Sequence, residues 1–203
     1  MKKDGNVLKT VKLYGKISLN DSWGKDMKNR KMIFAISLLS AAAAAGIFYI
    51  YGAGIKGGIY ALTAACLIII AAEDAMTRQI HDVLLLAVAV LGAADYFAAF
   101  SDMPDRAAGA LCVSLPMMLI NLITLRSMEK NSFGSGDVIL CFVCGFLFGI
   151  RSTLFACLTA FMCAGIYAAF LLIGRKASGQ DVFAFGPFIS MGFLLEMVRQ
   201  GLF

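Results

Sequence analysis

Repeated long apolar runs restrict most strongly what this chain can fold into. Seven runs cover approximately residues 32–51, 58–73, 83–100, 107–125, 138–150, 152–173 and 186–199. In lipid, each segment must satisfy its own backbone hydrogen bonds, so every run is expected to be a helix. Only 15% of the residues are charged, against about 25% in soluble domains. The sequence therefore predicts an all-α, polytopic membrane helix bundle with about seven (six to seven) transmembrane helices.

The first 31 residues differ in character from the rest, because they are polar and carry nine Lys or Arg residues. We expect a basic cytoplasmic tail at 1–31 and one membrane-embedded domain at 32–203. The run at 32–51 imitates the apolar core of a secretory signal, but it continues past the usual length of such a core. A retained first helix is therefore favoured. Met27 begins a second basic stretch, which leaves open whether residues 1–26 have a function.

The positions of the Lys and Arg residues predict the orientation. With a cytoplasmic N-terminus and seven alternating helices, fourteen of the 18 fall on the cytoplasmic side, as the positive-inside rule favours. Without the tail the split is five to four, which decides nothing. In either orientation an even number of helices separates Asp74 from Asp137, so both acids are expected on the same side of the membrane.

These two acids are the leading candidates for chemistry. Asp74 follows the second run, and Asp137 opens the fifth run directly after two glycines, Gly134 and Gly136. An ionisable residue at the edge of a bilayer is costly and indicates function. Two carboxylates within a few ångströms do not both ionise easily, so one keeps a proton and the pair titrates as a unit. Aspartic proteases use this arrangement, in which one carboxylate activates water and the protonated partner polarises the scissile carbonyl.

Metal and thiol chemistry find little support in the sequence. All six cysteines lie in apolar runs, and the C-x-x-C of Cys141 and Cys144 has no second such pair or histidine partner. We interpret these cysteines as small apolar residues of the interior. His81 is the only histidine, which excludes a histidine-based metal cluster.

Three motifs resemble one family of membrane proteases. Residues 134–137, Gly-Ser-Gly-Asp, match the G-x-G-D motif of membrane aspartyl proteases. Residues 74–82 are similar to the D-x-x-T-x-x-I-P-N/D segment of type IV prepilin peptidases, with His81 where that family usually has proline. Residues 185–188, Phe-Gly-Pro-Phe, are similar to the family's F-G-P-F motif. The three motifs occur in the family's order.

This resemblance implies a membrane aspartic endopeptidase that removes the short basic leader of type IV prepilin-like subunits at the cytoplasmic face of the cell membrane. In the family, cleavage falls just before the subunit's apolar N-terminal helix. Asp74 and Asp137 are implied as the catalytic pair, without a metal or another cofactor. The other motif residues are implied to bind substrate or to shape the loops of the site: Thr77, Ile80, Gly134, Gly136, Phe185, Gly186 and Pro187.

The resemblance also narrows the branch of the family. Larger bacterial members carry a zinc-binding insert with paired C-x-x-C motifs and methylate the new N-terminus; this chain has no such insert. It resembles the compact, peptidase-only branch that serves Flp-type pili or archaeal-type filaments, so no methyltransferase activity is expected. The implied partners are a prepilin-like protein and the lipid bilayer, and not nucleic acid. The oligomeric state does not follow.

Three alternatives use the same acids differently. In a small ion-coupled transporter or channel, Asp74 and Asp137 would form an ion site, but we find no internal repeat and this leaves the Phe-Gly-Pro-Phe segment unexplained. An inactive scaffold of a secretion system would not need both acids. The presenilin and signal-peptide-peptidase group also has G-x-G-D, but its first acid usually follows tyrosine, whereas Asp74 follows Glu73.

The remaining acids have simpler interpretations. Asp82 is expected to cap the third helix, and Asp95 to face an interhelical cavity or the interface. His81 is expected to leave its loop less rigid than proline would and to have a structural or incidental role; an interaction with Asp82 or with a charge on the substrate is the alternative. Because prepilin leaders are basic, four acids are together hypothesised to attract them electrostatically. These four are Glu73, Asp82, Glu129 and Asp181.

Overall fold

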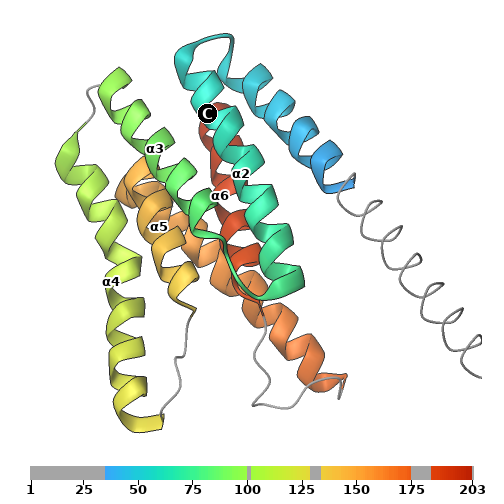
Figure 1. Cartoon of the computed structure of the whole chain (residues 1–203), viewed down its shortest axis with the longest axis vertical. Coiled ribbons are helices and arrows are strands. Elements are labelled where there is room, and N and C mark those ends of the chain that lie inside the picture. The colour runs from blue at the N-terminus through green and yellow to red at the C-terminus, as the bar shows by residue number, and fades with distance from the viewer. Residues whose placement is uncertain (1–34, 100–101, 129–133, 175–183, 203) are drawn as a thin grey trace, which may run out of the picture. The chain divides into compact units, whose positions relative to one another are not determined.

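The computed structural model describes residues 35–99, 102–128, 134–174 and 184–202. These residues form six helices and no strand (Figure 1), which confirms the all-α prediction. The helices are Ala35–Tyr51, α2 (Ile55–Thr77), α3 (Asp82–Ala99), α4 (Met103–Met128), α5 (Ser135–Ile173) and α6 (Gly186–Leu202). The predicted tail at 1–31 lies outside the described residues.

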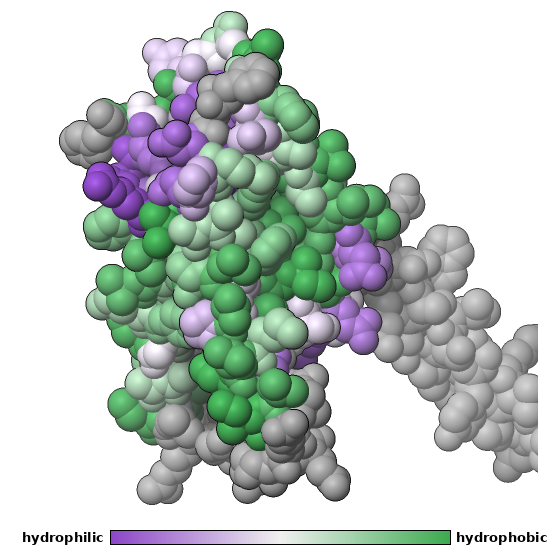
Figure 2. Space-filling model, turned by 90° about the vertical axis from the view of Figure 1, so that its left-hand side faces the viewer, coloured by the Kyte–Doolittle hydropathy of each residue, from purple (hydrophilic) through white to green (hydrophobic). Residues whose placement is uncertain are grey.

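The helical surface suits lipid. Three segments are long and apolar enough to cross a membrane, namely Ile55–Thr77, Met103–Thr124 and Ser135–Leu171. Large apolar side chains are exposed on the bundle; Leu86 is 64% exposed and Ile123 66%. Figure 2 shows hydrophobic residues in a broad band on one face, with hydrophilic residues gathered toward the upper end. The chain is a helical membrane protein, and a total of about seven spans stays a prediction.

The fifth and sixth apolar runs share one element, α5, whose two helical segments meet at a kink. The sequence places the break at Arg151, but the structure places it at Gly149, where φ is 75° and ψ is 175°. Glycine has no Cβ and adopts positive φ without strain, whereas Arg151 continues the helix. A break between the two runs is therefore confirmed, but it lies two residues before the predicted position, because hydropathy does not report backbone conformation.

Helix α5 is the centre of the bundle, because it packs against α3, α4 and α6, while α2 packs against α3 and α6. The buried core includes Leu67, Leu140, Leu147 and Phe193.

Helices α4 and α5 approach most closely at Gly109 and Gly145, where a Cβ on either glycine would collide with backbone of the other. Gly145 and Gly149 form a G-x-x-x-G pair, the spacing that allows close packing of membrane helices.

A buried ion pair lies near the ends of α3 and α4 that are remote from Asp74 and Asp137. Asp95 Oδ2 accepts a hydrogen bond of 2.5 Å from the Arg106 guanidinium, and Asp95 and Arg106 are only 2% and 6% exposed. The same guanidinium donates to the carbonyl of Phe146 at 3.4 Å. Asp95 was expected to face an interhelical cavity or the interface, but its carboxylate is paired with Arg106 instead. Through Arg106, this pair connects α3, α4 and α5.

Candidate active site

Asp74 lies in the last turn of α2 and is buried, with 5% of its surface exposed. The helix ends at Arg78, a left-handed residue (φ 55°, ψ 30°) whose N–H donates to the Asp74 carbonyl at 2.8 Å. The Thr77 hydroxyl donates to the Glu73 carbonyl at 2.8 Å and accepts from the Gln79 N–H at 3.3 Å. Thr77 therefore fixes the turn that follows Asp74.

The first residue of α6 contacts Asp74 directly. The Gly186 N–H donates to Asp74 Oδ2 at 2.9 Å, so this carboxylate sits at the positive end of the α6 dipole. A Cβ on Gly186 would lie 2.6 Å from the same oxygen. Pro187 follows within the first turn, where a missing N–H costs nothing. The Phe185 carbonyl accepts the N–H groups of Phe188 and Ile189 at 3.0 and 3.2 Å.

Asp137 lies in the first turn of α5 and is also buried, at 8% exposed. A Cβ on Gly134 would lie 3.1 Å from Asp137 Oδ2, and a Cβ on Gly136 would lie 3.2 Å from the Cβ of Ile80. Ile80 thus packs over Gly136 and holds the α2–α3 loop against the start of α5. Among the described residues, Asp137 Oδ1 has no hydrogen-bond partner. An unpaired buried oxygen is uncommon and often marks a functional site.

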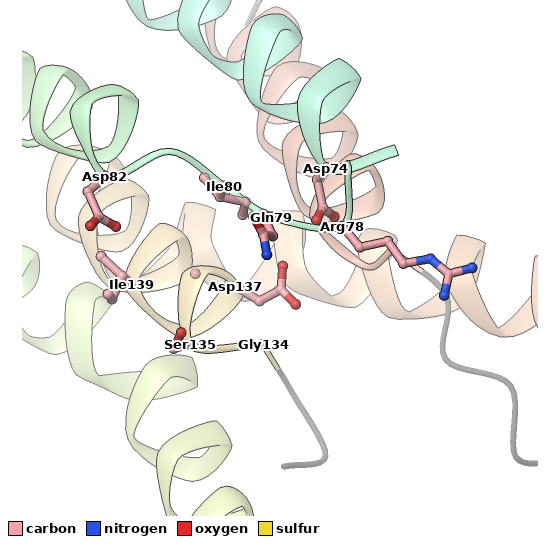
Figure 3. A pocket seen from close by; sticks show the side chains of 10 residues that line it. Asp74, Arg78, Gln79, Ile80, Asp82, Gly134, Ser135, Asp137 and Ile139 are labelled. Atoms are coloured by element: carbon pink, nitrogen blue, oxygen red, sulfur yellow. The ribbon is translucent and has the colours of Figure 1, made fainter. Parts of the chain in front are cut away.

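The two carboxylates share one pocket of about 290 Å³. Figure 3 shows Asp74 at the end of α2 and Asp137 at the start of α5, with the Gln79 side chain beside them. The lining residues are Asp74, Arg78, Gln79, Ile80, Asp82, Gly134, Ser135, Gly136, Asp137 and Ile139. Within the described part of the chain, no group of three His, Cys, Asp or Glu side chains is placed to hold a metal ion.

A protein-family model described as the type IV leader peptidase family matches residues 61–169, which is over half of the chain. The chain belongs to the type IV leader peptidase family. No curated protein and no solved structure matches it. The matched segment contains Asp74 and Asp137, whereas the Phe-Gly-Pro-Phe segment at 185–188 lies beyond it. The protein is thus a membrane peptidase whose family implies a prepilin-like substrate.

The structure of this leader peptidase separates the sequence-predicted residues into two groups. Ile80, Gly134 and Gly136 line the pocket with the two acids. Thr77 and Gly186 do not line it, although Thr77 orders the loop and Gly186 binds Asp74. Phe185 and Pro187 do not line it either: the Phe185 ring contacts the Phe161 ring, with centroids 5.1 Å apart, and Pro187 is in the first turn of α6.

Several pocket residues of the leader peptidase were not singled out from the sequence. Gln79 and Ser135 are variable positions of the two motifs, so the motifs gave no signal for them. Asp82 was expected to be the residue that caps α3, but α3 begins at Asp82 itself. The Leu84 N–H donates to the His81 carbonyl at 3.0 Å, which is the first hydrogen bond of this helix. His81 is therefore the cap, and Asp82 lines the pocket.

His81 also contacts Glu73 rather than Asp82. Its Nδ1 lies 3.0 Å from Glu73 Oε2, with the His81 side chain 67% exposed and the Glu73 side chain 28%. Glu73 belongs to the last turns of α2, so this contact joins the two ends of the α2–α3 loop. A proline at position 81 would restrict the backbone of this loop through its ring. With histidine there, the side-chain contact with Glu73 holds the loop instead.

Proposed function

We propose that this leader peptidase is an aspartic endopeptidase in which Asp74 and Asp137 are the catalytic pair. The observation that carries this proposal is the placement of two buried carboxylates on one pocket. The pocket lies where α2 ends and α5 begins (Figure 3), and we expect a flexible leader to enter there. The substrate is a type IV prepilin-like subunit of the Flp or archaeal-filament kind, and the product N-terminus leaves unmethylated.

The surroundings of the two acids suggest their roles. Asp74 accepts a hydrogen bond at a helix N-terminus, which favours its ionised form. Asp137 has an unpaired buried oxygen, which disfavours charge and favours the protonated form. Asp74 then takes a proton from water as the water oxygen attacks the scissile carbonyl carbon, and Asp137 gives its proton to the carbonyl oxygen. Collapse of the tetrahedral intermediate returns a proton to Asp137, and the C–N bond breaks as Asp74 protonates the leaving amine.

The orientation belongs to the same proposal. The tail at 1–31 lies in the cytoplasm, the domain at 32–203 is embedded in the cell membrane, and both acids face the cytoplasm. The excess of Lys and Arg in the tail supports this orientation.

Cleavage by the purified protein tests the function. Incubated in proteoliposomes with a prepilin-like substrate, it is expected to release the leader as one peptide at a single bond, which mass spectrometry identifies. Since the proposed chemistry uses carboxylates and water, EDTA is expected to leave the rate unchanged. Absence of cleavage, or loss of cleavage with EDTA, would contradict the proposal.

Electrostatic attraction of the basic leader gives a further prediction. Asp82 lines the pocket and Glu73 is next to Asp74 in α2, whereas Glu129 and Asp181 lie outside the described residues. Neutralising all four (Glu73→Gln, Asp82→Asn, Glu129→Gln and Asp181→Asn) is expected to lower kcat/KM severalfold at low salt, with a smaller effect at high salt because ions screen the field. Asp102→Asn, at an exposed acid on the far side, is the control. An unchanged rate at low salt would refute the attraction.

A further inference from the structure

An apolar groove adjoins the pocket that holds the two aspartates. It lies between α3 and α5, has a volume of about 460 Å³, and is lined by Asp82, Val83, Leu85, Leu86, Ala89, Ile139 and Val143. Asp82 and Ile139 line both the groove and the pocket. Apart from Asp82, every lining residue is apolar. The surface therefore changes from polar to wholly apolar at one boundary, beside Asp82.

The groove is built into the packing of the two helices. Leu85 and Val143 are buried, at 3% and 8% exposed, whereas Val83, Leu86 and Ile139 are 75%, 64% and 44% exposed. The small side chain of Ala89 lies between these levels of burial. The groove thus has buried residues at its base and exposed residues at its edges. Such a concave apolar surface can accommodate another apolar helix.

We propose that this groove binds the apolar N-terminal helix of the substrate, while the leader that precedes it lies in the two-aspartate pocket. This inference rests on the proposed function. A prepilin-like chain changes from polar leader to apolar helix next to the scissile bond, and the protein surface makes the same change next to Asp82. From Asp82 to Ala89, α3 advances about 10 Å, enough to contact about two turns of a helix.

The chemistry of the groove also sets the kind of binding. Lipid tails are as apolar as leucine, so a substrate helix that displaces lipid gains from close packing and not from the hydrophobic effect. The groove is therefore expected to orient the substrate and to place its scissile bond at the acids, with modest affinity of its own. Filling the groove should then raise KM for a substrate that has the helix.

Site-specific photo-cross-linking tests occupancy. A benzophenone amino acid replaces Leu86 in an Asp137→Asn background, in proteoliposomes with the full-length substrate. The matched control carries it at Ile123, which is equally exposed on α4 and does not line the groove. Severalfold more substrate cross-linking from position 86, competed by unlabelled substrate, is the expected result. Equal cross-linking from both positions, or cross-links from position 86 to lipid only, overturns the proposal.

A groove-filling variant supplies the kinetic test. Ala89→Phe is expected to raise KM severalfold for the full-length substrate, and less for a peptide that ends before the apolar helix. Ala94→Phe, at an exposed position of α3 outside the groove, should change neither value. Equal effects of Ala89→Phe on both substrates overturn the groove proposal alone, provided that the unaltered protein cleaves. If the unaltered protein cleaves neither substrate, the proposed function falls and the groove proposal with it.

Discussion

Asp74→Asn and Asp137→Asn are each expected to abolish leader cleavage. Asparagine has almost the shape of aspartate, but it neither takes a proton from water nor gives one to a carbonyl oxygen. General acid–base groups contribute about 10²- to 10⁴-fold to a rate, and residues that act as a unit lose nearly all of their effect when either is removed. Each variant should therefore fall to the limit of detection, with little change in fold.

The measurement is the initial rate of leader release by purified variants in proteoliposomes. Asp102→Asn, a change of the same kind at an exposed acid remote from the pocket, should keep the full rate. Circular dichroism and thermal unfolding should be similar for all three variants. Cleavage at the original rate in both Asp74→Asn and Asp137→Asn would remove the two-carboxylate mechanism, while loss in the Asp102 control would show that the change itself damages the fold.

Gly186→Ala is expected to lower the rate strongly with little loss of stability. The new Cβ would lie 2.6 Å from Asp74 Oδ2 and 3.0 Å from its Cγ. The closest crowded atom is a carboxylate oxygen, and the Asp74 Cβ follows at 3.2 Å, so the Asp74 side chain must turn away and lose its bond to the Gly186 N–H. A hydrogen bond to a charged group is worth about 1.5–3 kcal/mol, so a drop of roughly 10- to 100-fold is expected.

Gly165→Ala is the matched control, because a Cβ at this glycine in α5 meets nothing within 4 Å. Rates and unfolding temperatures of the two variants are compared. A Gly186→Ala protein with normal activity would show that the bond between α6 and Asp74 does not position the carboxylate. A large fall in unfolding temperature would instead mean that the backbone yields and not the side chain.

Much of this structure can be predicted from hydropathy and from the even number of helices between Asp74 and Asp137. The apolar runs predict the helices, and counting them places Asp74 and Asp137 at the same end, where the structure also brings them to one pocket. An apolar run indicates a membrane-embedded helix regardless of which other helices pack against it, so this part of the prediction needs no tertiary information. The break in α5 shows the limit: hydropathy marks the charge at Arg151, but the chain bends at Gly149, where the backbone is free to do so.

Contacts between distant segments were beyond the sequence. The Gly186 N–H reaches Asp74 across 112 positions, and Ile80 covers Gly136 across the α2–α3 loop. Neither contact follows from a local pattern, although both fall within segments that the motifs marked. The Glu73–His81 and Asp95–Arg106 pairs could not be predicted either. The sequence contains several acidic and basic residues, and it does not indicate which of them pair.

The close approach of Gly109 and Gly145 has a consequence for how a substrate enters. The backbones of α4 and α5 are in direct contact there. Changes of side-chain rotamer therefore cannot alter the spacing of the two helices at this point. Gly149, beside this crossing, is about 18 Å along α5 from Asp137. Widening that admits a polypeptide is therefore expected to pivot about this fixed crossing, with the largest displacement at the opposite end, where the acids lie and α3 borders the groove.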